Sequence, residues 1–216
     1  MLSASVEDYA KAIYVLESRH GVASTNALAE RLEVSAPAVS AMVKKLASLG
    51  YVSHVRYRGV RLTADGRRVA LEVLRHHRLL ETYLVEELGV PWEQVHAEAE
   101  VLEHVLSEGL EERIAAKLGD PTHDPHGDPI PAADGTVAEA ATVALSALAV
   151  GGRGVFVRVS DSDPAVLREL AERELRPGDS VEIVDRTARG RTVTSAGTTQ
   201  ELPNRLTQAM RVEVRG

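Results

Sequence analysis

One short stretch of the sequence concentrates side chains that can bind a metal ion. It runs from residue 96 to residue 104 and reads HAEAEVLEH, and its content of Ala, Glu and Leu favours a helix. In a helix, two imidazoles and two carboxylates would project within an arc of about 100 degrees. They are His96, Glu100, Glu103 and His104. Nitrogen and oxygen donors at this spacing can coordinate a cation, whereas the alternative interpretation is a solvated acidic helix.

Two neighbouring segments could add further ligands. His77 and Glu81 lie four residues apart in the preceding helical segment. The loop over 119–135, which is rich in Pro, Gly and Asp, contains His123, Asp124 and His126. Most loops of this composition only connect two elements, so metal ligation and a plain connection both remain open there.

The absence of cysteine limits the chemistry that the chain can perform. With no Cys, the chain has no disulfide, no thiolate nucleophile and no sulfur-based zinc site. Any metal would be held by His, carboxylate, backbone carbonyl or Met. This donor set favours manganese, iron(II), cobalt, nickel or zinc over copper(I) or an iron–sulfur cluster.

Composition and charge indicate a soluble protein with a basic head. The 216 residues are 44% hydrophobic and 26% charged, which suits one domain with a good core or two small ones. We find no apolar run near twenty residues and no signal peptide, so we expect a cytoplasmic protein without a membrane span. Residues 1–72 carry a net charge of +3 and the remainder −10. This asymmetry favours contact with nucleic acid through one end.

The basic head has the pattern of a winged helix-turn-helix. Apolar spacing predicts helices over 6–19, 25–32 and 38–49, the last opened by Pro37 and ended by Gly50. A strand over 51–55, a basic turn over 56–59 and a return strand over 60–62 then predict a wing. We expect phosphate contacts from Lys44, Lys45, Arg56, Arg58 and Arg61, and groove contacts from Ser35, Pro37 and Ser40. The alternative is a winged helix that contacts only protein.

The rest of the chain predicts a helical domain and a small β-rich domain. Long helices are expected from 63 to about 88, from 92 to 106 and on to about 118. Their apolar faces would pair with a second copy, since DNA-binding modules of this size usually read two half-sites of a palindromic or pseudo-palindromic DNA site as a two-fold dimer. Residues 136–149 form a short helix or a tether. Beyond residue 154, four strands (155–159, 181–184, 192–194 and 210–214) and a helix (164–174) predict a small β-barrel.

These motifs together resemble the diphtheria toxin repressor family of metal-dependent transcriptional regulators, and most closely its manganese-responsive branch. The resemblance rests on the winged helix and on the segments HRLLE (77–81), VHAEAEVLEHV (95–105) and HGDPIP (126–131). It implies an α+β chain: a winged helix-turn-helix over 1–72, an all-α metal-binding and dimerisation domain over 73–135, a linker over 136–153, and an SH3-like small β-barrel over 154–216. The barrel resembles a domain of ferrous-iron transport proteins.

The resemblance also implies which residues bind metal. One site would be lined by Asp8, Glu100, Glu103 and His104, and a neighbouring one by His77, Glu81 and His96. Asp124 and His126 stand where some manganese-type relatives have a ligating Cys and His, and Asp163 or Asp161 would supply a ligand from the third domain. Small manganese regulators carry a Glu at the position of Lys11, so their paired-ion arrangement does not transfer whole.

The expected function is a manganese(II)-dependent repressor of metal-uptake genes that binds double-stranded DNA as a homodimer. Iron-responsive relatives carry a Met at the position of Asp8 and a Cys at that of Glu100, and hard oxygen donors there favour Mn2+. The expected mechanism is a cation that bridges the DNA-binding and dimerisation domains. Alternatives are an Fe2+-dependent repressor, a purely structural metal, and a metalloenzyme that activates water, although no general base separate from the ligands is apparent.

Overall fold

The structure is a computed structural model that describes residues 2–138, 140–161 and 163–215. It divides into two compact units. The first unit contains residues up to 77 together with 102–107 and 131–136, and the second contains 78–101, 108–130 and the residues from 137 on. Within the described ranges, no helix is long and apolar enough to cross a membrane.

The first unit contains the expected helix-turn-helix. Its helices are α1 (Ala4–His20), α2 (Thr25–Arg31) and α3 (Ala36–Ser48), and α1 packs against both others. Serine hydroxyls cap two of them: Ser24 Oγ accepts from the Ala27 amide at 3.2 Å, and Ser35 Oγ from the Ala38 amide at 3.4 Å. A core that includes Ile13, Leu28 and Leu46, all completely buried, holds the three helices together.

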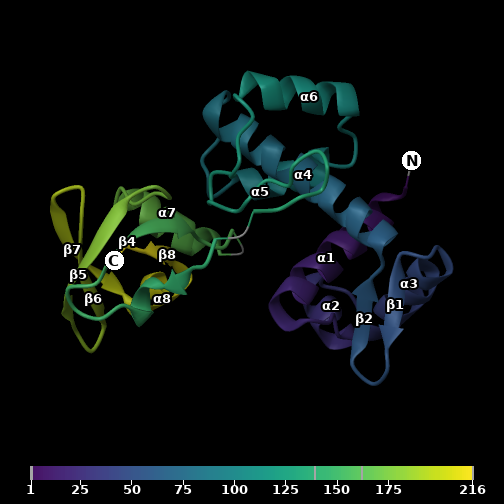
Figure 1. The fold of residues 1–216 in the computed structure, drawn as a ribbon, viewed down its shortest axis with the longest axis horizontal. Coiled ribbons are helices and arrows are strands. Elements are labelled where there is room, and N and C mark those ends of the chain that lie inside the picture. The colour runs from purple at the N-terminus through teal and green to yellow at the C-terminus, as the bar shows by residue number, and fades with distance from the viewer. Residues whose placement is uncertain (1, 139, 162, 216) are drawn as a thin grey trace. The chain divides into compact units, whose positions relative to one another are not determined.

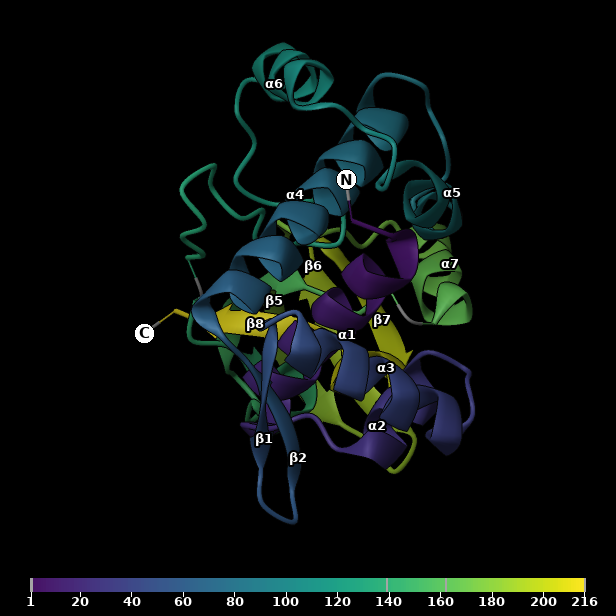
Figure 2. The ribbon, with the colours of Figure 1, turned by 90° about the vertical axis from the view of Figure 1, so that its right-hand side faces the viewer.

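The wing is an antiparallel hairpin that extends beyond these helices (Figures 1 and 2). β1 (Val52–Val55) pairs with β2 (Gly59–Leu62), with Val52 opposite Leu62. Val60 also exchanges two backbone hydrogen bonds with Ala23, which ties the wing to the segment between α1 and α2. Gly59 allows this approach, because a Cβ there would lie 2.0 Å from the Ala23 carbonyl oxygen. The prediction of a winged helix-turn-helix is confirmed.

Three further helices follow, and one is shorter than predicted. α4 (Ala64–Glu86) and α6 (Glu108–Lys117) lie within the expected ranges, whereas α5 covers only Val95–Leu102 instead of 92–106. Glu103 and His104 therefore lie in a turn after the helix. The expectation that they share one helical face with His96 and Glu100 is wrong.

The third domain, part of the second unit, is a six-stranded antiparallel sheet with two helices (Figure 1). Its strand order is β3-β8-β4-β5-β6-β7. The strands are β3 (Val143–Ala144), β4 (Arg153–Arg158), β5 (Ser180–Arg186), β6 (Gly190–Ser195), β7 (Thr198–Pro203) and β8 (Arg211–Val214). The helices are α7 (Pro164–Glu172) and α8 (Asn204–Ala209), and a 3-10 turn covers Leu145–Ala147. Strands β3 and β7 and helix α8 were not predicted.

One apolar core holds this domain to the segment before α5. The chain's single Phe and single Trp, Phe156 and Trp92, both belong to it, together with Leu170, Ile183 and Val212. Trp92 precedes α5 and is 4% exposed. The third domain is therefore packed onto the second unit's helical part by the same apolar contacts that form its interior.

Candidate metal centre

The first unit brings together Asp8, Glu103 and His104, which we call the Asp8 cluster. Each offers a ligand atom, and these atoms lie within 4.8 Å of one another. His104 Nε2 is 2.9 Å from Asp8 Oδ1 and 3.6 Å from Glu103 Oε1. The other ring nitrogen, Nδ1, lies 2.6 Å from Glu7 Oε2, an acid that sequence reasoning missed although it precedes Asp8 on α1. The resemblance predicted these three ligands together with Glu100, and Glu100 does not belong to this cluster.

Glu103 occupies a fully buried position between two basic side chains. Lys11 donates to its Oε1 at 2.6 Å, and His77 Nδ1 lies 2.5 Å from its Oε2. Its backbone carbonyl accepts from His76 Nδ1 at 3.1 Å. The carboxylate and the carbonyl of Glu103 are thus both engaged by residues that lie far away in the sequence, on α1 and α4.

The second unit contains another group of ionisable side chains, centred on Glu81. We call Glu81, His96, Asp124, His126 and Asp161 the Glu81 cluster. Glu81 Oε1 lies 3.2 Å from His96 Nδ1, and its Oε2 lies 3.6 Å from His126 Nδ1. The side chains of Glu81 and His126 are completely buried. Glu100, one turn along α5 from His96, approaches His96 Nε2 at 3.6 Å.

The loop that carries His126 is fixed by its own aspartate and by one glycine. Asp124 Oδ1 accepts from the amides of His126 (2.8 Å) and Asp128 (2.9 Å), while its Oδ2 lies 3.6 Å from Arg78 Nε. Gly127 has φ +82°, and a Cβ there would meet the Val157 carbonyl oxygen at 1.8 Å. The loop therefore lies directly against β4, and Asp124 organises it besides being a candidate ligand. His123, in contrast, is exposed and pairs with Thr122.

The structure separates the two aspartates proposed for the third domain. Asp161 Oδ2 lies 3.1 Å from His96 Nδ1. Asp163 is the N-cap of α7, where its Oδ1 accepts from the amides of Ala165 at 2.9 Å and Val166 at 3.3 Å. Asp163 is therefore engaged in helix capping, and the geometry favours Asp161 as the ligand.

The electrostatics of the Glu81 cluster fit a divalent cation. Burial lowers the pKa of His96, but hydrogen bonds and charges from Asp161 and Glu81 outweigh it and raise the pKa to about 10. Burial likewise opposes the charge on His126, yet Glu81 and Asp124 raise its pKa to about 9. Burial raises the pKa of Asp124 well above its usual value. The acidic side chains of the cluster are thus neutralised by bound protons or by protonated imidazoles. A hard divalent cation can replace these protons, because carboxylate oxygen and imidazole nitrogen are its usual ligands.

The residues predicted to contact DNA form an exposed basic surface on the first unit. Lys44 and Lys45 are exposed on α3, and Arg56 and Arg58 are exposed at the tip of the wing. Ser35, Pro37 and Ser40 are exposed in the first turns of α3. Arg61 has a structural role as well, since its Nε donates to the Gly21 carbonyl at 2.6 Å.

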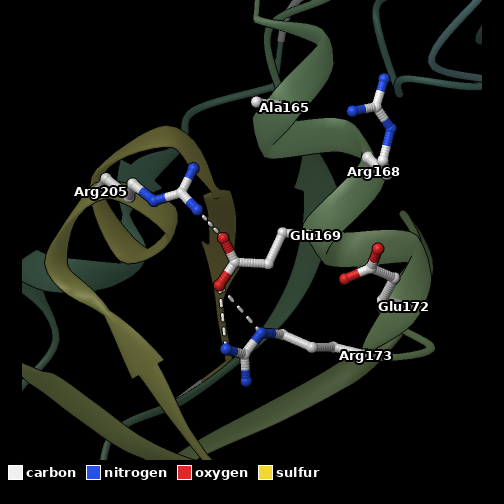
Figure 3. A pocket seen from close by; sticks show the side chains of 6 residues that line it. All are labelled: Ala165, Arg168, Glu169, Glu172, Arg173 and Arg205. Carbon is white, nitrogen blue, oxygen red and sulfur yellow. Dashed lines mark hydrogen bonds and ion pairs between the residues drawn. The ribbon is translucent and has the colours of Figure 1, made fainter.

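A surface pocket of about 460 Å3 lies elsewhere, on the third domain (Figure 3). It is lined by Ala165, Arg168, Glu169, Glu172, Arg173 and Arg205. Glu169 is shared between Arg173, at 2.9 Å, and Arg205. The wall of the pocket thus contains internal ion pairs, and no histidine is among its lining residues.

Family models cover most of the chain. The model described as "Iron dependent repressor, N-terminal DNA binding domain" matches residues 1–60. The model of the "metal binding and dimerisation domain" of the same repressors matches residues 63–132. A FeoA domain matches residues 143–214.

Individual proteins match over different lengths. The diphtheria toxin repressor of Corynebacterium diphtheriae is 33% identical over 97% of this chain and 96% of its own length. The iron-dependent repressor IdeR of Mycobacterium leprae is 45% identical, but over 59% of this chain, and the match spans only 55% of that repressor.

Solved structures match over almost the whole chain. A manganese-dependent transcriptional repressor in complex with manganese has a TM-score of 0.87 and 42% identity, covering 97% of this chain and 100% of its own. IdeR of T. acidophilum has a TM-score of 0.78 and 30% identity, covering 100% of both chains. The manganese regulator SloR gives 0.76 and 32%, covering 97% of this chain and 98% of its own.

Proposed function

Because the chain belongs to the iron-dependent repressor family of metal-dependent, DNA-binding regulators, we propose that it is a transcriptional repressor gated by manganese(II). The family is one of repressors and not of enzymes, which removes the metalloenzyme alternative. We place the protein in the cytoplasm as a homodimer on a palindromic or pseudo-palindromic operator. Exposed apolar side chains such as Val101 (72% exposed) and Leu110 (50%) offer a surface on α5 and α6 for the second copy.

One observation carries this proposal: the Asp8 cluster joins the first helix of the DNA-binding unit to the turn after α5. Asp8 lies on α1, which packs against the recognition helix α3, whereas Glu103 and His104 follow α5. Three acids, Glu7, Asp8 and Glu103, lie around His104, and a bound divalent cation would supply the positive charge that they require. Asp8 would then be held at a fixed distance from His104, and α1 would transmit that position to α3.

We propose Mn2+ as the metal in the cell, with Fe2+ as the second candidate. Asp8 and Glu100 offer hard carboxylate oxygens at positions where the iron-responsive members of the family carry Met and Cys. Structural neighbours described as manganese-dependent support manganese, and the similarly close iron-dependent relatives keep iron in consideration. Since intrinsic affinities follow the Irving–Williams order, binding strength in vitro does not by itself decide between them.

The test is a titration of labelled promoter DNA, followed by fluorescence anisotropy at fixed salt. Mn(II), Fe(II) under anaerobic conditions, Zn(II) and a chelator are compared. Asp8→Met should weaken Mn(II)-dependent binding at least tenfold, whereas the control Asp134→Met, at an exposed aspartate of the same unit, should not. Equal DNA binding in chelator and in Mn(II) would refute metal gating, and a lower requirement for Fe(II) than for Mn(II) would assign iron instead.

A further inference from the structure

Trp92 forms the middle of a three-layer stack that includes a candidate ligand. Its ring lies nearly parallel to that of His126, with centroids 5.6 Å apart and an interplanar angle of 19°. The guanidinium of Arg176 lies over the Trp92 ring at 4.0 Å. The three residues come from the segment before α5, the loop after α6, and the turn before β5, all within the second unit.

The backbone of Trp92 also determines which nitrogen His126 can offer to a metal. His126 Nε2 lies 2.8 Å from the Trp92 carbonyl oxygen, and since a carbonyl only accepts, Nε2 carries the proton. The unprotonated lone pair of a neutral imidazole is then on Nδ1, the atom that faces Glu81 Oε2 at 3.6 Å. Ligating histidines are commonly oriented through their other nitrogen in this way.

The two outer members of the stack are themselves held in place. The backbone of His126 is fixed on both sides, by Asp124 Oδ1 at its amide and by the Val159 amide at its carbonyl, 2.9 Å away. Arg176 begins a tight turn in which its amide donates to Asp179 Oδ2 at 2.7 Å. The turn is attached to β4, because the Gly178 amide donates to the Phe156 carbonyl at 2.7 Å. Rotation of the imidazole is thus the freedom left to His126, and the Trp92 ring restricts it.

We propose that Trp92 and Arg176 are positioning residues of the Glu81 cluster, which hold His126 with Nδ1 toward Glu81 so that the third domain contributes to metal binding. This inference rests on the metal dependence proposed above. It also has a practical consequence: Trp92 is the only tryptophan of the chain, and its emission reports on the state of His126. Arg176 acts through Trp92, not as a ligand.

The test uses the full chain and Mn(II), without DNA. Binding is measured by equilibrium dialysis and by Trp92 emission, in the wild type and in an Asp8→Asn background that weakens the Asp8 cluster. Arg176→Met removes the cation from the indole face and should weaken Mn(II) binding at the Glu81 cluster about 2- to 5-fold. Arg176→Lys should restore part of the affinity. The matched control is Arg168→Met, an exposed arginine of α7 that takes no part in the ion pairs drawn in Figure 3.

The outcomes separate this proposal from the proposed function. Saturating Mn(II) should change the Trp92 emission, and diamagnetic Zn(II) should also change it, so that the response is not simple quenching by a paramagnetic ion. Mn(II) binding with unchanged emission, or equal affinities for Arg176→Met and Arg168→Met, would overturn the role of the stack and leave metal gating intact. No Mn(II) binding in dialysis would overturn both. Because Arg176 is exposed, its variants test the proposal even where a Trp92→Leu protein fails to fold.

Discussion

Replacing Lys11 with Met tests the charge balance of the Asp8 cluster. The Lys11 ammonium donates to Glu103 Oε1 at 2.6 Å, with 10% of its side chain exposed and none of that of Glu103. Met retains most of the apolar stem of Lys11 and removes only the charge. Removing one partner of a buried ion pair costs about 3–5 kcal/mol, since the other charge stays buried. His77, which also contacts Glu103, keeps the expected loss toward the lower end of that range.

The measurement is the thermal unfolding midpoint, followed by circular dichroism in chelator and in Mn(II). For a chain of this size, a loss of about 3 kcal/mol lowers the midpoint by about 6–12 °C. If Glu103 is a metal ligand, Mn(II) supplies the missing positive charge, so the deficit should shrink in Mn(II). The control Lys45→Met, at an exposed lysine of α3, should stay within about 0.5 kcal/mol of the wild type in both conditions.

Two results would refute this reasoning. Equal midpoints for Lys11→Met and Lys45→Met in chelator would show that the buried pair contributes no net stability. A deficit in Lys11→Met that is the same in chelator and in Mn(II) would show that Glu103 does not coordinate the ion, although the ion pair itself matters.

Three further predictions concern the Glu81 cluster and the DNA surface. With a pKa of about 10, His96 is protonated at neutral pH and must lose that proton to coordinate a metal. This proton alone should make the apparent Mn(II) affinity rise up to tenfold per pH unit between about pH 7 and 9, and the proton of His126, whose pKa is about 9, should make the rise steeper. Calorimetry in buffers of different ionisation enthalpy should detect the released protons, and a flat pH profile would contradict the prediction. Gly127→Ala should lift the His126 loop off β4, because a Cβ would lie 1.8 Å from the Val157 carbonyl oxygen. Equilibrium dialysis should then show that Mn(II) is lost from the Glu81 cluster and still bound at the Asp8 cluster, and unchanged occupancy would argue against His126 as a ligand. Arg58→Ala should reduce the slope of log affinity for DNA against log salt concentration by about 1, without altering stability. Arg61→Ala should also lower the thermal unfolding midpoint, because the hydrogen bond to the Gly21 carbonyl is lost. Identical stabilities for the two variants would refute the structural role of Arg61.

The winged helix could be predicted from the sequence because its signals are local. Ser24 and Ser35 cap helices, Pro37 starts one, and Gly50 ends it, and each acts within a few residues of itself. Strand alternation over the wing is equally local. In the third domain the local signals located four strands and one helix, but β7 and α8 were missed, since TTQELP and NRLTQA are polar segments whose structure depends on pairing with β6 and on packing in the domain core.

The site could be predicted by composition but not by arrangement. The stretch from His96 to His104 reads as one helix, yet Glu103 lies in the turn after α5. There Lys11 and His77 contact its carboxylate and His76 contacts its carbonyl, and these partners lie far away in the sequence. The same limit applies to Asp161 and Asp163. Both are acids before a helix, and only the hydrogen bonds distinguish them, because the aspartate next to Pro164 satisfies two amides of the first turn of α7 while Asp161 remains available to His96. Where two candidate ligands lie this close in the sequence, the one that caps a helix is the less available to a metal. We therefore expect Asp161→Asn to reduce Mn(II) affinity at the Glu81 cluster. Asp163→Asn keeps a side-chain oxygen for the cap and should leave that affinity unchanged.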